Sequence, residues 1–354
     1  MHASEEKPSS VPSVSGSGFK RLKYSGHHFG CARVMRHIEQ ALTDRGGVIW
    51  ARIDGKMDWR KDPATLQKIA DCDVIVINGE GTLHHGRKKA SWLIAVGNHP
   101  VTQSKKLALI NTLYQENPDS WAPMLRGFQY LYARDARSAR AMSEKVGRYV
   151  TWLPDLSTAA GSDPSSVPRR GIAIGDSVSK TATNFLANLA MDLNTSEPTR
   201  ILPLTISLRE ENPYRPALRR RLRRWTVDWR QRRQQRNFPI LTYLRSEKDY
   251  VEAIKATRLS VTGRFHGICL NLVTATPFIC ITSNSWKIEA LFEDAGIDLR
   301  RLVSIERLTK KMVMEEDWSF SEREQENIRS YLARSSQQAK AMFDRITGVD
   351  GPEL

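Results

Sequence analysis

The residues best suited to chemistry lie in the segment 262–267, which reads Thr-Gly-Arg-Phe-His-Gly. The segment follows a predicted strand and precedes an apolar helical pattern. In extended backbone, Arg264 and His266 would point to the same side while Phe265 points into the core. A guanidinium beside a titratable imidazole can hold a carboxylate or phosphate and move a proton. The alternative interpretation is a surface arginine beside a capping histidine.

A second candidate binding segment, residues 78–82, reads Asn-Gly-Glu-Gly-Thr and follows a β-branched run. Such a run is typical of a strand buried on both faces of a parallel sheet, and ligands bind at the carboxyl ends of these strands. Gly79 and Gly81 would let the backbone approach a ligand, and a helix beginning here would attract anions. Glu80 and Thr82 would add polar contacts. The alternative is a tight turn that uses glycine for geometry alone.

Two further cations could reach the same ligand. Arg134 follows a predicted strand and precedes Asp135, which we expect to be a helix N-cap. Lys287 would lie in the first turn of a helix, where a cation opposes the helix dipole unless an anion lies nearby. An ordinary exposed lysine at a helix start is the alternative. Asp155 follows another predicted strand, as a second cap or as a carboxylate near the ligand.

We predict no metal site and no disulfide. His84 and His85 are adjacent, so they would not face one metal together on a helix or strand. The four cysteines include no Cys-x-x-Cys pair, which favours a reducing compartment. The first 18 residues lack the regions of a secretory signal, and no apolar run approaches the roughly 18 residues that span a bilayer. We therefore expect a cytoplasmic protein.

These segments need a scaffold that positions them, and the chain predicts one. Short apolar runs alternate with helical patterns, which is typical of stacked β-α units around a parallel sheet. In the first half we expect strands at 19–24, 48–53, 74–77, 107–110, 130–133 and 149–153. In the second half we expect them at 171–174, 201–208, 240–244, 259–262 and 278–282.

The resulting fold prediction is α/β, with two doubly wound Rossmann-like domains that face each other across a cleft. Residues 159–170 carry two prolines and no periodicity, which is typical of a linker. The predicted parts are a disordered tail at 1–18, an N-terminal domain at 19–160, a linker at 161–170, and a C-terminal domain at 171–354 with a basic insertion at 210–238.

Together the motifs resemble the polysaccharide pyruvyl transferase family over roughly residues 20–300. The resemblance rests on the Gly-x-Gly-Thr segment, Arg-Asp-x-x-Ser at 134–138, Leu-Pro-Asp at 153–155 and the stretch 261–296, which is its most specific part. Departures from the family pattern are Glu80, where glycine is commoner, the pair His27-His28, and the arginine-rich segment 215–236.

The resemblance implies a fold like the GT-B glycosyltransferases and the transfer of pyruvate from phosphoenolpyruvate to sugar hydroxyls as a ketal, in cell-surface or exopolysaccharide biosynthesis. It implies that Arg134, Arg264, His266 and Lys287 form the donor-binding and catalytic set, with His266 as the general acid or base. No cofactor is expected. A glycosyltransferase of GT-B type that uses a nucleotide sugar stays open, as does a non-catalytic member that binds membrane or polymer.

The segment 215–236 holds ten arginines against one acid, so it supplies more than half of the net charge of +15. Leu218, Leu222, Trp225 and Trp229 follow at 4-3-4 spacing and would form one apolar helical face. Such a helix suits the surface of an anionic membrane, and the family's acceptors are often lipid-linked sugars. The alternative is a helix that packs this face on the body. Nucleic acid is the least favoured partner, because no recognised nucleic-acid module is present.

Overall fold

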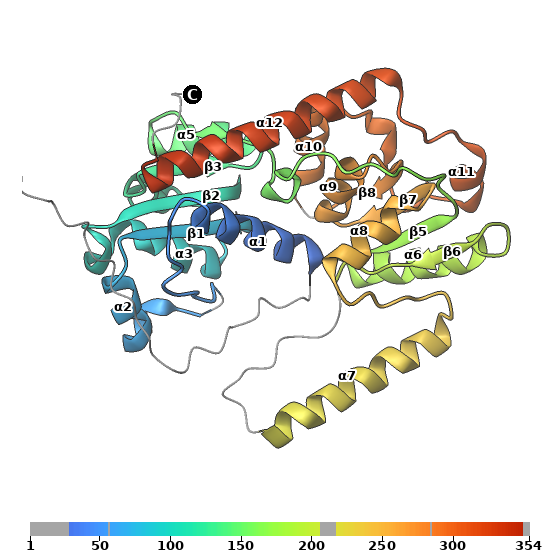
Figure 1. The fold of residues 1–354 in the computed structure, drawn as a ribbon, viewed down its shortest axis with the longest axis horizontal. Helices are drawn as coiled ribbons and strands as arrows, with labels where there is room; N and C mark the ends of the chain where they lie inside the picture. Colours follow the sequence, from blue (N-terminus) through green and yellow to red (C-terminus); the bar gives the residue numbers. More distant parts are fainter. Residues whose placement is uncertain (1–27, 56, 206–216, 284, 350–354) are drawn as a thin grey trace, which may run out of the picture.

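The protein consists of two α/β units joined by helices that run between them (Figure 1). The computed structural model describes residues 28–55, 57–205, 217–283 and 285–349. The predicted tail at 1–18, the predicted strand at 19–24 and part of the predicted insertion, 210–216, lie outside the described residues.

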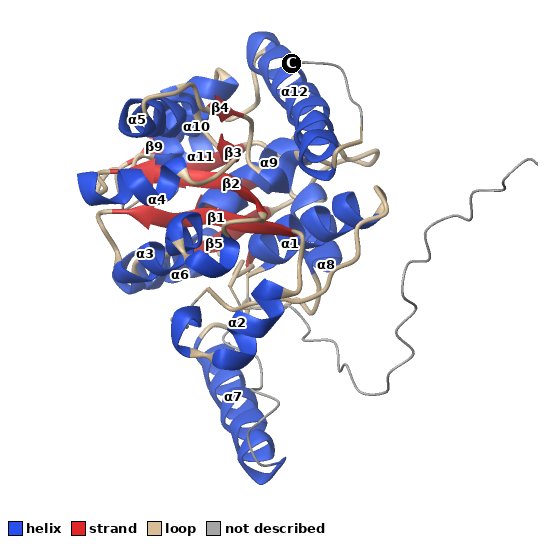
Figure 2. Ribbon diagram, turned by 90° about the vertical axis from the view of Figure 1, so that its left-hand side faces the viewer, coloured by secondary structure: helices blue, strands red, loops and turns tan. Residues whose placement is uncertain are grey.

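The first unit is a parallel sheet in the order β1-β2-β3-β4. Its strands are β1 (Val74–His84), β2 (Lys106–Gln115), β3 (Tyr130–Ala133) and β4 (Thr151–Trp152). Leu109 of β2 enters the core formed with α2 to α5, whereas Ile110 enters the core formed with α1 and α12. Helices therefore cover both faces (Figure 2). They include α1 (Phe29–Thr43), α2 (Pro63–Ala70), α3 (Lys88–Ile94), α4 (Ala122–Arg126) and α5 (Ala136–Val146).

The second unit is a parallel sheet in the order β6-β5-β7-β8-β9. Its strands are β5 (Ile172–Ser177), β6 (Thr199–Ile201), β7 (Leu259–Gly263), β8 (Phe278–Ile281) and β9 (Leu302–Val303). Its helices include α6 (Lys180–Leu193), α7 (Ala217–Asn237), α8 (Glu247–Lys255), α9 (Phe265–Val273), α10 (Lys287–Ala295), α11 (Lys310–Glu315) and α12 (Glu322–Thr347). Two α/β units, each with a parallel sheet, confirm the predicted class of two Rossmann-like domains.

The strand order of the second sheet reverses between β5 and β7. The chain leaves β5 toward β6 on one side and returns to β7 on the other. In open α/β sheets such a reversal opens a crevice at the carboxyl ends of the two strands, where ligands bind. Residues that directly follow β5 and β7 are therefore the first candidates for a site.

The strand predicted at 48–53 is wrong. This stretch has no regular secondary structure, and Val48 and Trp50 are 76% and 50% exposed. Arg52 pairs instead with Glu39 of α1, with one N···O distance of 2.8 Å. None of the described strands pairs with this stretch. Likewise, β6 ends at Ile201 and no strand continues through 202–205, while 206–208 of the predicted strand 201–208 lie outside the described residues. Leu241 makes only an isolated bridge to Ile201, so the strand predicted at 240–244 is also absent.

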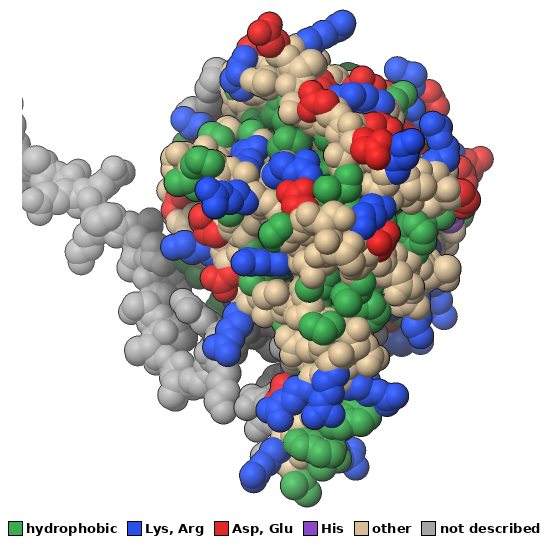
Figure 3. Space-filling model, turned by 90° about the vertical axis from the view of Figure 1, so that its right-hand side faces the viewer, with side chains coloured by type: hydrophobic (Ala, Val, Ile, Leu, Met, Phe, Trp, Pro, Cys, Tyr) green, Lys and Arg blue, Asp and Glu red, His purple; other side chains and the backbone are tan. Residues whose placement is uncertain are grey.

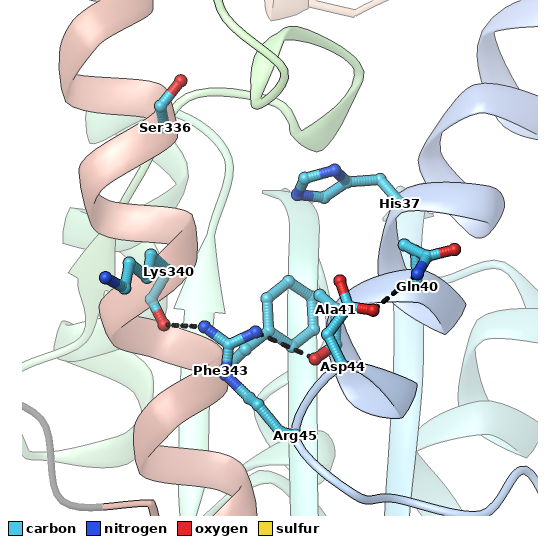
Figure 4. A pocket seen from close by; sticks show the side chains of 8 residues that line it. All are labelled: His37, Gln40, Ala41, Asp44, Arg45, Ser336, Lys340 and Phe343. Atoms are coloured by element: carbon cyan, nitrogen blue, oxygen red, sulfur yellow. Dashed lines mark hydrogen bonds between the residues drawn. The ribbon is translucent and has the colours of Figure 1, made fainter.

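Helices α12 and α1 connect the domains, and α1 contacts α8 and α9 of the second unit. The first half of α12 packs on α10, whereas its second half packs on α1 and the first sheet. A pocket opens between α12 and the C-terminal half of α1 (Figure 4), lined by His37, Gln40, Ala41, Asp44, Arg45, Ser336, Lys340 and Phe343. Arg45 is held there by Asp344 at 2.7 Å and by the carbonyl of Lys340 at 3.1 Å. Protein groups therefore balance the charge of Arg45. The side chains that could take part in a reaction lie at the opposite, N-terminal end of α1.

Candidate functional site

Arg264 lies at the strand reversal of the second sheet. It directly follows β7 and forms the N-cap of α9. Its Nε and Nη2 donate to Oδ2 of Asp176 in β5, at 2.8 and 2.6 Å. Oδ1 of Asp176 accepts from the backbone N–H of Leu204 at 2.9 Å. The carboxylate therefore fixes this guanidinium at the carboxyl end of the sheet.

The extended backbone predicted around Arg264 is wrong for the residues that follow it. Phe265 and His266 form the first turn of α9, because every residue of that helix is buried and the apolar pattern extends through both. Phe265 is 8% exposed and packs in the core as predicted. His266, 6% exposed, meets residues of the first domain.

A buried carboxylate from the first domain joins two predicted site residues. Asp155 follows β4, is fully buried, and accepts from the backbone N–H of Ser157 at 2.9 Å. Its Oδ1 lies 3.5 Å from Nε2 of His266, and its Oδ2 lies 3.6 Å from Nη1 of Arg134. Burial alone would raise the pKa of Asp155, but His266, Arg134 and Ser157 hold it well below its ordinary value. Asp155 is therefore a carboxylate, and it can orient the imidazole.

Arg134 is a buried cation with donors to spare. Its side chain is 2% exposed, and its guanidinium lies over the ring of Phe265 at 4.2 Å. Among the described residues, none accepts a hydrogen bond from its buried Nε or Nη2. A buried guanidinium loses its hydration and requires partners in return. Its unmet donors match the two oxygens of a carboxylate or phosphate.

Lys287 is the first residue of α10, in the helix turn that the sequence predicted. Burial, followed by the charges of Arg134, Arg264 and Arg87, lowers its pKa to about 8. Three arginines acting on one buried ammonium are costly unless an anion offsets their charge. Arg87, the exposed N-cap of α3, was not predicted because nothing in its local pattern points to the second domain.

The glycine segment has a different structure from the one predicted. β1 continues to His84 and α3 begins only at Lys88, so no helix starts beside Gly81. A Cβ on Gly79 would lie 2.2 Å from Oγ1 of Thr112, so packing against β2 requires this glycine. A Cβ on Gly81 would meet only Nη2 of Arg134, at 3.9 Å, so this glycine leaves space in front of the guanidinium.

The two polar residues of the segment differ in their surroundings. Glu80 has a positive φ of 39°. Its carboxylate accepts from the side-chain amide of Asn78 at 2.9 Å and from the thiol of Cys31 at 3.0 Å. Glu80 therefore ties β1 to α1. Thr82 lies half-buried near the carboxyl end of β1.

One neighbour of His266, the start of α1, was not predicted as part of the site. The ring of His28 packs edge-to-face on His266 at 5.1 Å, and its Nδ1 caps α1 at Cys31. His28, Cys31 and His266 each offer one ligand atom within 4.8 Å of the others, so these three could hold a metal ion. However, burial and Glu80 raise the pKa of Cys31 well above its ordinary value, and burial, His266 and Arg264 lower that of His28. Nearby arginines oppose a cation.

Known proteins resemble this chain in sequence and in fold. Residues 36–285 match the sequence model of the family described as Polysaccharide pyruvyl transferase. No curated protein sequence matches the chain.

Solved structures match at low identity. A putative UDP-N-acetylglucosamine 2-epimerase from Listeria monocytogenes has a TM-score of 0.49 and 9% identity, over 90% of this chain and 87% of that one. Accessory secretory protein 1, 2 and 3 of Streptococcus pneumoniae has a TM-score of 0.44 and 10% identity, over 84% and 62%. The Gap123 complex of Streptococcus agalactiae has a TM-score of 0.39 and 12% identity, over 81% and 56%. This chain thus spans less than two thirds of the two streptococcal chains.

Proposed function

The chain belongs to the polysaccharide pyruvyl transferase family, and on this premise we propose that it transfers pyruvate from phosphoenolpyruvate to two hydroxyls of a sugar, forming a ketal. The observation that carries the proposal is the buried guanidinium of Arg134, whose Nε and Nη2 have no acceptor among the described residues. Arg264 and Lys287 add positive charge from the second domain. The donor carries a carboxylate and a phosphate, so its charge complements this cluster.

The proposed reaction begins with proton transfer from His266 to the methylene carbon of phosphoenolpyruvate. The carbon that carries the phosphate becomes an oxocarbenium centre, and a sugar hydroxyl attacks it and loses its proton. That proton returns to His266. Phosphate then leaves with the electron pair of its C–O bond, and a second hydroxyl attacks the same carbon and closes the ketal, its proton passing to the released phosphate. Asp155, 3.5 Å from Nε2 of His266, supports the charged imidazole.

To test the proposal, phosphorus NMR monitors the release of phosphate from phosphoenolpyruvate with lipid-linked sugars as acceptors. We expect Arg134→Lys, which keeps the charge and loses the forked donors, to lower kcat/KM by about 10- to 100-fold. Arg137→Lys is the matched control, because Arg137 is exposed and pairs with Glu293. Release of a nucleoside diphosphate from a nucleotide sugar, with no turnover of phosphoenolpyruvate, would instead identify a glycosyltransferase.

We also propose that α7 docks on the anionic surface of the cytoplasmic membrane and brings the site to lipid-linked acceptors. α7 lies apart from both sheets (Figures 1 and 2), and basic and apolar side chains crowd together on the projection that it forms in Figure 3. Leu218, Leu222, Trp225 and Trp229 are 74%, 63%, 66% and 51% exposed, which supports docking over the alternative in which this face packs on the body. Exposed tryptophans beside arginines favour an anionic interface.

Binding to lipid vesicles tests the docking proposal. We expect the protein to sediment with vesicles of phosphatidylcholine and phosphatidylglycerol, less so at high salt, and not with phosphatidylcholine alone. The double variant Trp225→Ser/Trp229→Ser should lose this binding. Trp50→Ser is the control, because Trp50 is a tryptophan outside α7 with an exposed fraction, 50%, close to the 51% of Trp229. Equal binding by the double variant and the wild type would exclude α7 as the contact. Among the described helices, none is long and apolar enough to cross a bilayer.

A further inference from the structure

The buried member of the His84-His85 pair borders the proposed donor site and takes no part in the steps above. His84 is the last residue of β1, is 3% exposed, and pairs in register with Gln115 at the end of β2. Oε1 of Gln115 accepts from the backbone N–H of Trp286, the N-cap of α10, at 3.3 Å. The carboxyl end of the first sheet therefore lies against the start of α10.

Several polar atoms at this junction lack protein partners. Within the described ranges, no hydrogen-bond partner exists for the buried Nδ1 of His84, Oγ of Ser285 or Nε1 of Trp286. No side chain caps the nine-residue helix α10, so the N–H groups of its first turn also need acceptors. Buried polar atoms without partners are rare in folded proteins, and each calls for an explanation such as a bound ion.

We infer that His84, Ser285 and the first turn of α10 form a pocket for the phosphate group of the donor. The inference rests on the proposed function, because it assigns the two anionic groups of phosphoenolpyruvate to different parts of the site. The unmet donors of Arg134 take the carboxylate, beside His266. The helix N-terminus, with Lys287 in its first turn, takes the phosphate, since uncapped N–H groups and a cation both favour a dianion.

The charges around His84 agree with such a pocket. Burial, followed by the charges of Arg87, His85, Lys287 and Arg134, lowers its pKa to about 4. In the empty site His84 is therefore neutral at pH 7. A dianion offsets the charges of Arg87, Lys287 and Arg134 and raises the pKa of His84, so the imidazole gains a proton and donates a charge-assisted hydrogen bond. Binding of a tetrahedral dianion should thus be coupled to uptake of a proton.

Isothermal titration calorimetry of the full chain tests this coupling. Inorganic sulfate is the probe for the proton, because it stays a dianion throughout the neutral range, and inorganic phosphate is the probe for affinity. At pH 7, in two buffers of different ionisation enthalpy, we expect the wild type to take up close to one proton per sulfate bound. His84→Asn should abolish that uptake and weaken phosphate binding about tenfold.

Two other variants serve as references. His85→Asn is the matched control, because His85 is exposed and pairs with Glu116, and it should keep both affinity and proton uptake. Ser285→Ala should weaken binding but keep the uptake, and it carries the test if His84→Asn does not fold. Wild-type binding without proton uptake, or phosphate binding by a folded His84→Asn that equals that of the wild type, would overturn the pocket.

The same preparations separate this inference from the proposed function. If sulfate binding depends on His84 but phosphoenolpyruvate is never turned over, the pocket stands and pyruvyl transfer falls. If phosphoenolpyruvate is turned over and His84→Asn leaves its KM unchanged, the transfer stands and the phosphate pocket falls.

Discussion

Asp155 connects the two kinds of chemistry that the site combines. Its Oδ1 lies 3.5 Å from the imidazole of His266, and its Oδ2 lies 3.6 Å from the guanidinium of Arg134. One buried carboxylate thus lies within ion-pair distance of both a proton carrier and an anion-binding cation. Because the pKa of Asp155 stays well below its ordinary value, this arrangement persists over the whole neutral range.

At the same scale, Lys287 predicts how affinity depends on pH. Its pKa is lowered to about 8 in the empty site, and a bound anion favours the charged form and raises that pKa. Loss of the Lys287 proton should therefore weaken donor affinity further above pH 8, by up to tenfold per pH unit beyond the decline that proton uptake by His84 causes. Calorimetry with phosphoenolpyruvate between pH 7 and 9.5 measures this.

Lys287→Arg is the control for that titration, because arginine stays charged throughout this range. If the variant binds the donor, its affinity should not show the additional decline above pH 8 that loss of the lysine proton causes in the wild type. A wild-type affinity that is unchanged from pH 7 to 9.5 would contradict a role for Lys287 in binding.

The sequence predicted some of these residues and missed others for a physical reason. Arg264 and Lys287 were found because each lies at a recognisable strand end or helix start. The pairing of Arg264 with Asp176, and the contact of His28 with His266, depend on how separate segments pack, which no local pattern contains. Arg87 was missed as well, because it acts on the site through its charge, which helps to lower the pKa of Lys287.

At the scale of elements, α12 is anchored by a buried ion pair. Arg301 is fully buried, and its Nε and Nη2 donate to both oxygens of Glu324 in the first turn of α12, at 2.8 and 3.0 Å. The same guanidinium donates to the carbonyls of Trp318 and Ser319, at 2.7 and 2.9 Å. The hydrogen-bond partners of this guanidinium are protein groups, so removing Arg301 leaves the buried carboxylate of Glu324 and these backbone carbonyls without their donor.

Replacing this arginine should therefore destabilise the protein strongly. We expect Arg301→Met to lower the free energy of unfolding by about 3–5 kcal/mol, because Glu324 stays buried without its partner. The double variant Arg301→Met/Glu324→Met should recover part of the loss. Arg300→Met, which changes an exposed neighbour, should have little effect. Urea denaturation of the four proteins measures the differences. An Arg301→Met variant as stable as the wild type would refute the anchoring role.

The elements themselves were predictable where burial decides their type. β2 and β7 were expected as strands from short apolar runs, and both are buried in parallel sheets. The prediction failed at 48–53, where none of the described strands pairs with the stretch, and at 78–82, where the register between β1 and β2 shifts and the strand continues. Neighbouring strands, rather than the local sequence, determine both outcomes.

At the scale of the whole molecule, the site exists only while the two domains stay together. Asp155 and Arg134 come from the first domain, and His266, Arg264 and Lys287 from the second. The two-domain α/β class was predictable from the β-α rhythm. The relative placement of the domains was not, because it depends on contacts such as those of α5 with α10 and on α12, which runs from one domain to the other.

One of these contacts should depend on pH. Asp294 of α10 accepts from the backbone N–H of Ala136, at the start of α5, at 3.0 Å. Burial, with the nearby Asp135 and Glu293, raises the pKa of Asp294 to about 6. The folded state therefore binds its proton more tightly than the unfolded chain does, where an aspartate titrates near 3.9. The free energy of unfolding consequently falls as the pH rises from about 4 through 6. Above about pH 6 the protein bears the full energetic cost of burying the charged carboxylate.

Asp294→Asn removes this cost while keeping an oxygen for the Ala136 N–H. At pH 7.5 we expect the variant to be more stable than the wild type by about 1–2 kcal/mol, and the difference should shrink steadily as the pH falls to 4.5. Glu293→Gln, on the neighbouring exposed carboxylate that pairs with Arg137, should show no such gain. Urea denaturation across this pH range measures both. An equal or lower stability of Asp294→Asn at pH 7.5 would mean that the charge of Asp294 helps to hold the domains together, because its attraction to the start of α5 would then outweigh its burial.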